Sequence, residues 1–185
     1  MEEYSVRRRK IRIETYLLVS FFVGILIGTI MINQMGQKWM DSLTIYNTYF
    51  YQQLQFNTVN KISLFFYILK ERLGIFIFLW IVGFSIIGEL GLIAVFTYLG
   101  YFVAILLGTA TMIYGPVGLF IFLGIVFPHY ILYGYGMYLM KEHIKYKNRE
   151  SLGQAFVALT FICITCIAGA MAESWINPYI LRLLL

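Results

Sequence analysis

The stretch from Leu73 to Met140 constrains this chain more than any other part of its sequence. Within it, only Glu89 and His129 carry side chains that can be charged near neutral pH. A helix that crosses ~30 Å of hydrocarbon needs about 20 mostly apolar residues, and this stretch holds enough for several such helices. The sequence therefore predicts an integral membrane protein, with lipid as the main solvent.

The overall composition supports the same prediction. The chain of 185 residues is 61% hydrophobic and 12% charged, whereas about 25% of the residues in soluble domains are charged. The net charge of +5 does not indicate nucleic-acid binding, because the cations lie just outside apolar runs, as membrane topology requires. We expect one membrane domain over residues 1–185, surrounded by lipids, with no nucleic acid as a partner.

The apolar runs divide into about five predicted transmembrane helices, so the predicted fold is an all-α polytopic bundle. Glycine-bearing turns at Gly88–Gly91 and Gly115–Pro116 separate the central helices. The segment 34–69 is aromatic and amphipathic. It is predicted either to lie in the outer membrane interface or to cover the outer mouth of the bundle. The predicted spans are roughly 16–33, 70–87, 91–113, 117–140 and 153–178.

Two dense groups of cations set the predicted orientation. One group lies at 7–12, before the first predicted helix, and the other lies at 141–149, between the fourth and the fifth. A chain with five spans places both groups on the same side of the membrane. Because such groups face the cytoplasm in most membrane proteins, we expect a cytoplasmic amino terminus and a carboxyl terminus outside.

Two predicted helices carry small residues at a spacing of four. This pattern lets another helix approach closely in a membrane, although glycine is also common in membrane helices for other reasons. The residues are Ser20, Gly24 and Gly28 on the first helix and Gly100, Ala104 and Gly108 on the third.

Pro128 and His129 lie near the middle of the predicted helix 117–140. Proline cannot donate a hydrogen bond to the carbonyl of Gly124, so a kink is expected there. A freed carbonyl in lipid needs a new partner, and an ionisable side chain at this depth suggests function. Two interpretations remain: a neutral His129 that bonds Tyr133 or a freed carbonyl and ties helices together, or a polar gate or ion path.

Glu89 and Glu173 are the remaining candidates for a polar site in the membrane. The predicted spans place Glu89 at the cytoplasmic edge and Glu173 near the outer edge, so both are expected to be hydrated and they cannot both pair with His129. Cys163 and Cys166 are interpreted as small apolar residues of one helix. The sequence contains no recognisable catalytic, cofactor or metal-binding set, so we do not expect an enzyme.

Several of these segments together resemble the stage II sporulation protein M family. The blocks that carry the resemblance are Gly24–Gly28, Lys70 with Phe78–Gly88 (FLWIVGFSIIG), Tyr98–Gly108 (YLGYFVAILLG), Gly118-Leu-Phe and Phe127-Pro-His129. The five predicted helices and the long outer segment after the first helix also fit this family. One departure is Tyr130, where the family often has glycine.

The resemblance implies a non-enzymatic membrane scaffold of the engulfment complex in endospore-forming bacteria. Its location would be the bacterial cytoplasmic membrane, at the septal or engulfing membrane of the mother cell. Its implied partners are the peptidoglycan-degrading stage II sporulation proteins D and P, whose single anchor helices would dock on the small-residue faces. A homo-oligomer remains open. An alternative function is the permease component of an ATP-driven exporter.

Overall fold

The computed structural model describes residues 2–34, 60–85, 87–146 and 151–184, and helices are the only regular secondary structure within these ranges. The predicted all-α class is therefore confirmed for the described residues. The predicted outer segment 34–69 lies mostly outside them. The elements are α1 (Glu2–Gln34), α3 (Lys61–Gly83), α4 (Gly88–Tyr114), the 3-10 turn η1 (Gly115–Val117), α5 (Gly118–Val126), α6 (His129–Tyr146), α7 (Leu152–Met171), the π-helical turn η2 (Ala172–Ile176) and α8 (Asn177–Leu184).

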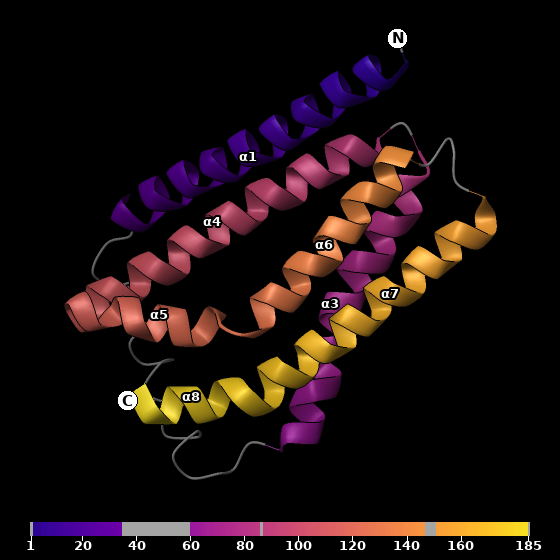
Figure 1. Cartoon of the computed structure of the whole chain (residues 1–185). Helices are drawn as coiled ribbons and strands as arrows, with labels where there is room; N and C mark the ends of the chain where they lie inside the picture. Colours follow the sequence, from indigo (N-terminus) through magenta and orange to yellow (C-terminus); the bar gives the residue numbers. More distant parts are fainter. Residues whose placement is uncertain (1, 35–59, 86, 147–150, 185) are drawn as a thin grey trace.

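Among the described residues, three stretches are long and apolar enough to cross a membrane: Ile13–Gln34, Gly88–Val126 and Leu152–Ile180. The second stretch contains the turn η1, where Gly115 has a φ of 59°, a left-handed conformation that glycine adopts without steric cost. The predicted turn at Gly115–Pro116 is confirmed, and the chain reverses there so that α5 packs against α4 (Figure 1).

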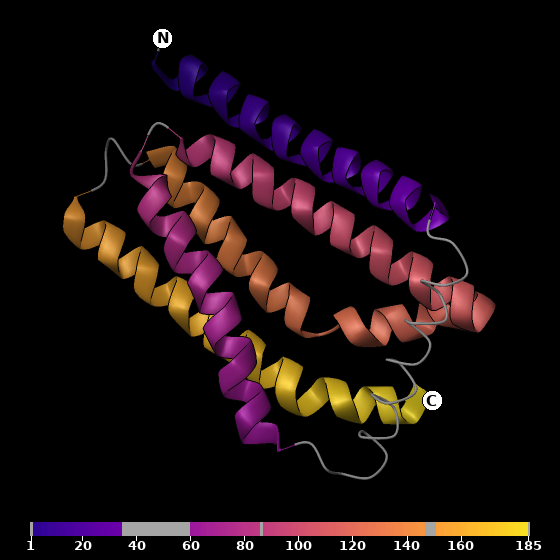
Figure 2. The same cartoon turned by 180° about the vertical axis from the view of Figure 1, so that it is seen from behind.

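The helices run alongside one another between two ends of the bundle. The start of α1, the ends of α3 and α6 and the starts of α4 and α7 gather at one end (Figure 1). The end of α1, the start of α3, the α4–α5 turn and α8 lie toward the other end, and the view from behind agrees (Figure 2). An ion pair of 3.2 Å between Glu14 and Lys141 joins α1 to α6 near the first end. Although burial would lower the pKa of Lys141, its hydrogen bonds to Glu14 and Glu142 raise that pKa.

The core lies between α3, α4, α6 and α7. Its fully buried side chains include Leu79, Leu92, Met140 and Ile162. Large apolar side chains also cover the outside, as in Phe66 and Phe78, which are 62% and 64% exposed. Soluble monomers rarely expose apolar patches of this extent. An outer surface of this kind is suited to contact with lipid.

Two predicted helix boundaries are wrong. Helix α3 begins at Lys61 rather than near residue 70, because the Asn60 side chain accepts hydrogen bonds from the backbone N–H groups of Ile62 and Ser63 and so caps the helix. The turn before α4 also comes earlier than predicted. It is centred on Ser85, whose hydroxyl donates to the carbonyl of Val82 and accepts from the N–H of Ile87.

The predicted helix 117–140 is not a single kinked helix. It is two helices, α5 and α6, which are separated at Phe127 and Pro128. Phe127 has an extended backbone with φ −88° and ψ 142°, as expected for a residue before proline. The peptide bond between Phe127 and Pro128 is cis. The interruption lies where the kink was predicted, but it separates two helices rather than bending one.

The two small-residue faces pack against each other between α1 and α4. A methyl group on Gly28 would lie 2.7 Å from the carbonyl oxygen of Tyr101 and 2.8 Å from Cβ of Ala104. Gly24 and Gly100 meet the facing backbone in the same way, and Gly108 meets the side chain of Ile32. Ser20 is buried and donates to the carbonyl of Leu17. Helices of this chain therefore occupy the places that we had assigned to partner anchor helices.

Candidate functional site

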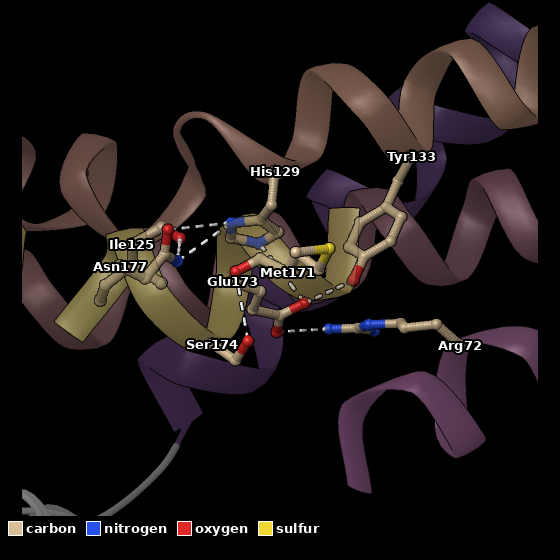
Figure 3. Close-up of polar contacts among 8 residues, drawn as sticks. All are labelled: Arg72, Ile125, His129, Tyr133, Met171, Glu173, Ser174 and Asn177. Carbon is tan, nitrogen blue, oxygen red and sulfur yellow. Dashed lines mark hydrogen bonds and ion pairs between the residues drawn. The ribbon is translucent and has the colours of Figure 1, made fainter. Parts of the chain in front are cut away.

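A cluster of polar side chains lies where the α5–α6 break faces the η2 turn (Figure 3). Its members are Arg72 from α3, His129 and Tyr133 from α6, Glu173 from η2 and Asn177 from α8. We call these five residues the polar cluster. The segments that contribute them lie far apart in the sequence and are brought together by the packing of α3 and α6 with the α7–α8 region.

Glu173 is the centre of the polar cluster. Its Oε1 accepts a hydrogen bond of 3.2 Å from the guanidinium of Arg72, and its Oε2 accepts one of 2.8 Å from the hydroxyl of Tyr133. The Arg72 guanidinium also lies 5.4 Å from the centre of the Tyr133 ring. The side chains of Arg72 and Glu173 are only 33% and 18% exposed. A carboxylate in such surroundings requires pairing, because an unpaired buried charge is very costly.

His129 and Asn177 form the other half of the polar cluster. The His129 ring is almost completely buried, at 2% exposure. Its Nδ1 lies 3.2 Å from Oδ1 and 3.0 Å from Nδ2 of Asn177. Its Nε2 lies 3.9 Å from Oε2 of Glu173, which is too long for a hydrogen bond. The two halves of the cluster therefore face each other through His129 Nε2 and Glu173 Oε2, without a hydrogen bond between them.

Asn177 also completes the backbone bonding of the helix break. Its Nδ2 donates a hydrogen bond of 2.6 Å to the carbonyl of Ile125, in the last turn of α5. That carbonyl cannot be bonded within α5, because the helix ends at Val126. In a membrane such a group must find a partner inside the protein. One amide side chain thus stabilises the end of α5 and holds the His129 ring.

The π-helical turn explains how Glu173 and Asn177 reach the same region. Glu173 and Ser174 belong to η2, where α7 passes into α8, and Ser174 donates to the carbonyl of Met171. Insertions of this kind are frequent at functional sites because they redirect side chains on an otherwise regular helix. Phe65 of α3 packs on Trp175 with ring centres 5.6 Å apart and fixes the turn from the other side.

The structure brings together only part of the predicted site. His129, Tyr133 and Glu173 converge, and Pro128 lies at the adjacent break, but Glu89 lies in the first turn of α4 at the opposite end of that helix from α5. Glu173 is within the cluster, and its side chain is only 18% exposed. The partner of His129 is Asn177 rather than Tyr133. Arg72, which is not among the predicted site residues, also turns into the cluster.

The two cysteines form no hydrogen bond with the polar cluster in the described part of the chain. Cys163 and Cys166 are both free thiols, and Cys166 is fully buried in the core. Among the described residues, no group of three or more His, Cys, Asp or Glu side chains is arranged to hold a metal ion. Comparison with protein families, with curated proteins and with solved structures finds no match to this chain. The resemblance to the sporulation family therefore stays a prediction from the sequence.

Proposed function

We propose that this chain is a non-enzymatic scaffold of the bacterial cytoplasmic membrane that holds peptidoglycan-degrading proteins in place during engulfment. The observation that carries the proposal is the closed polar cluster. Both carboxylate oxygens of Glu173 and both ends of the Asn177 amide are used within the chain. Such a cluster ties helices into a fixed frame, which suits a scaffold, and the family resemblance supplies the biological setting.

In this proposal the chain crosses the membrane five times, with its amino terminus in the cytoplasm. The three long apolar stretches support the proposal, and α3 and the α5–α6 pair run beside them (Figure 1). Lys141 and Lys145 lie at the same end of the bundle as the start of α1, which agrees with a cytoplasmic location of that end.

The proposed partners are the stage II sporulation proteins D and P, with their enzymatic domains outside. Because α1 and α4 fill each other's small-residue faces, partner anchor helices would contact exposed apolar side chains instead. The first turns of α3 offer Ile62, Phe66 and Tyr67, all at least 60% exposed. These residues lie at the proposed outer end, within the predicted outer segment 34–69.

Affinity purification from sporulating cells tests this proposal. Tagged protein should gather at the asymmetric septum and co-purify with the two hydrolytic partners. Substitution of Phe66 by Ala should reduce co-purification several-fold, whereas substitution of the equally apolar and 55% exposed Phe22 on α1 should not. Uniform membrane distribution of the wild-type protein, without co-purification, would refute the scaffold.

A permease component of an ATP-driven exporter is the second candidate function. It is favoured by the meeting of two irregular segments, the α5–α6 break and the η2 turn, at one polar cluster (Figure 3). Interrupted helices that meet in the membrane often form the binding sites of transporters. Stable co-purification with an ATPase subunit, and loss of export in His129→Ala, would favour this function. Retention of all partner binding and sporulation in His129→Ala would favour the scaffold.

A further inference from the structure

The Asn177 amide presents both a donor and an acceptor to the same nitrogen of His129. Its Nδ2 is 3.0 Å and its Oδ1 is 3.2 Å from Nδ1. A neutral ring without a proton on Nδ1 can accept from Nδ2, and a ring with a proton on Nδ1 can donate to Oδ1. The hydrogen bond from Nδ2 to Ile125 keeps the amide in place in both cases. The structure therefore accommodates a neutral or a protonated His129 without rearrangement on this side.

The opposite nitrogen of His129 faces an acceptor with unused capacity. Its Nε2 is 3.9 Å from Oε2 of Glu173, which already accepts from Tyr133. An ionised carboxylate has about four lone-pair positions, so Oε2 can accept a second donor. A shift of roughly 1 Å would bring Nε2 within the hydrogen-bonding range. The His129 ring can therefore bind one additional proton while Glu173 accepts a hydrogen bond from its Nε2.

We propose that His129 and Glu173 form a proton-binding site within the membrane domain. Uptake of one proton from water makes His129 an imidazolium. Its Nδ1–H is then donated to Asn177 and its Nε2–H to Glu173. The 3.9 Å gap closes to hydrogen-bond distance, and the start of α6 is drawn toward the η2 turn. This site would operate in either of the proposed functions and does not depend on them.

Almost complete burial of the His129 ring opposes the imidazolium, and the charged neighbours act in addition to this cost. The negative charge of Glu173 favours the imidazolium, whereas the positive charge of Arg72 opposes it. The remaining neighbours are neutral at physiological pH and contribute mainly through packing and hydrogen bonds. From the packed elements they are Tyr130 and Tyr133 on α6, Cys166 on α7, Asn177 on α8 and, beside Tyr130, Tyr98 on α4.

Nuclear magnetic resonance of the histidine rings tests the proposal directly. The chain contains only two histidines, His129 and His143, so selective ¹³C and ¹⁵N labelling gives two ring signals, which His143→Asn assigns. In lipid nanodiscs, the His129 signals should change from those of a neutral ring to those of a protonated ring as the pH is lowered from about 8 to the lowest pH at which the protein stays folded. In Glu173→Gln the imidazolium loses its counter-charge. The change in the His129 signals should then require a roughly tenfold higher proton concentration, or it should disappear.

The matched control is Glu89→Gln, which removes a carboxylate from the first turn of α4, away from the polar cluster. It should leave the pH dependence of the His129 signals as in the wild type. A His129 ring that stays in one protonation state over the whole range in the wild-type protein would overturn the proposal. The same pH dependence in folded Glu173→Gln would also overturn it. The wild-type result alone decides the question if Glu173→Gln does not fold.

Discussion

Substitution of Gly28 by Ala tests the close packing of α1 on α4. The added methyl group would lie 2.7 Å from the carbonyl oxygen of Tyr101 and 2.8 Å from Cβ of Ala104, whereas ordinary contact begins near 3.4 Å. Because the first of these atoms belongs to the backbone, the two helices must separate locally by about 0.7 Å. Overpacking of this kind costs about 1–3 kcal/mol.

The gain in helix propensity offsets part of this cost. Replacement of Gly by Ala in a helix is worth about 0.5–1 kcal/mol, so the net loss of unfolding free energy should be on the order of 1–2 kcal/mol. Gly134→Ala on α6 is the matched control, because a methyl group there has nothing within 4 Å. This variant should be unchanged or slightly more stable.

The assay is reversible unfolding in mixed micelles, with helix content measured against the mole fraction of denaturing detergent. The predicted order of stability is Gly134→Ala at or above the wild type, and Gly28→Ala below it. Equal stability of Gly28→Ala and Gly134→Ala would refute the close approach of α1 and α4.

Two other predictions concern the helix break and the topology. Asn177→Ala should lower the unfolding free energy by about 1–3 kcal/mol, because the Ile125 carbonyl loses its donor within the membrane. The control is Thr160→Ala, which removes an exposed hydroxyl. An effect of Asn177→Ala no larger than that of the control would contradict this role. In a variant without native cysteines, a membrane-impermeant maleimide added to intact cells should label Asn60→Cys and not Ser151→Cys. These residues directly precede α3 and α7, and the starts of these two helices lie at opposite ends of the bundle (Figure 1). Equal labelling of both positions would contradict five spans.

Much of the architecture follows from hydropathy and from the positions of glycine and proline. The long uncharged stretch predicted the membrane helices, and Gly115 with Pro116 marked the α4–α5 turn correctly. These features depend on local properties of the chain. The start of α3 was placed too late because Lys70, Glu71 and Arg72 interrupt the apolar pattern, so that the amphipathic turns before them were assigned to the outer segment 34–69.

The composition of the polar cluster was harder to predict. Proline and histidine drew attention to Pro128 and His129, but Arg72 and Asn177 were not among the predicted site residues. Their inclusion depends on how far α3 extends and on the π-helical turn, which brings Glu173 and Asn177 toward α6. A single residue inserted into a helix has no reliable sequence signal, so the contacts it creates emerge only in three dimensions.

The small-residue faces illustrate a different limit. The spacing of Gly24, Gly28 and Gly100 predicts that a helix packs closely against each face, but it does not say which helix. In the structure the small-residue face of α1 packs against that of α4. A motif for helix contact thus cannot by itself distinguish a site within the chain from a partner-binding site.

The central claim is that the polar cluster acts as one closed unit that joins α3 to the α6–η2 region. A double-mutant cycle with Arg72→Met and Glu173→Gln, measured by reversible unfolding, tests it most directly. Each single substitution leaves the other side chain without its partner in a mostly buried site. We expect the free energy of unfolding of the double variant to be higher than the sum of the single effects implies, by about 0.5–3 kcal/mol. Additivity within about 0.3–0.5 kcal/mol would contradict it.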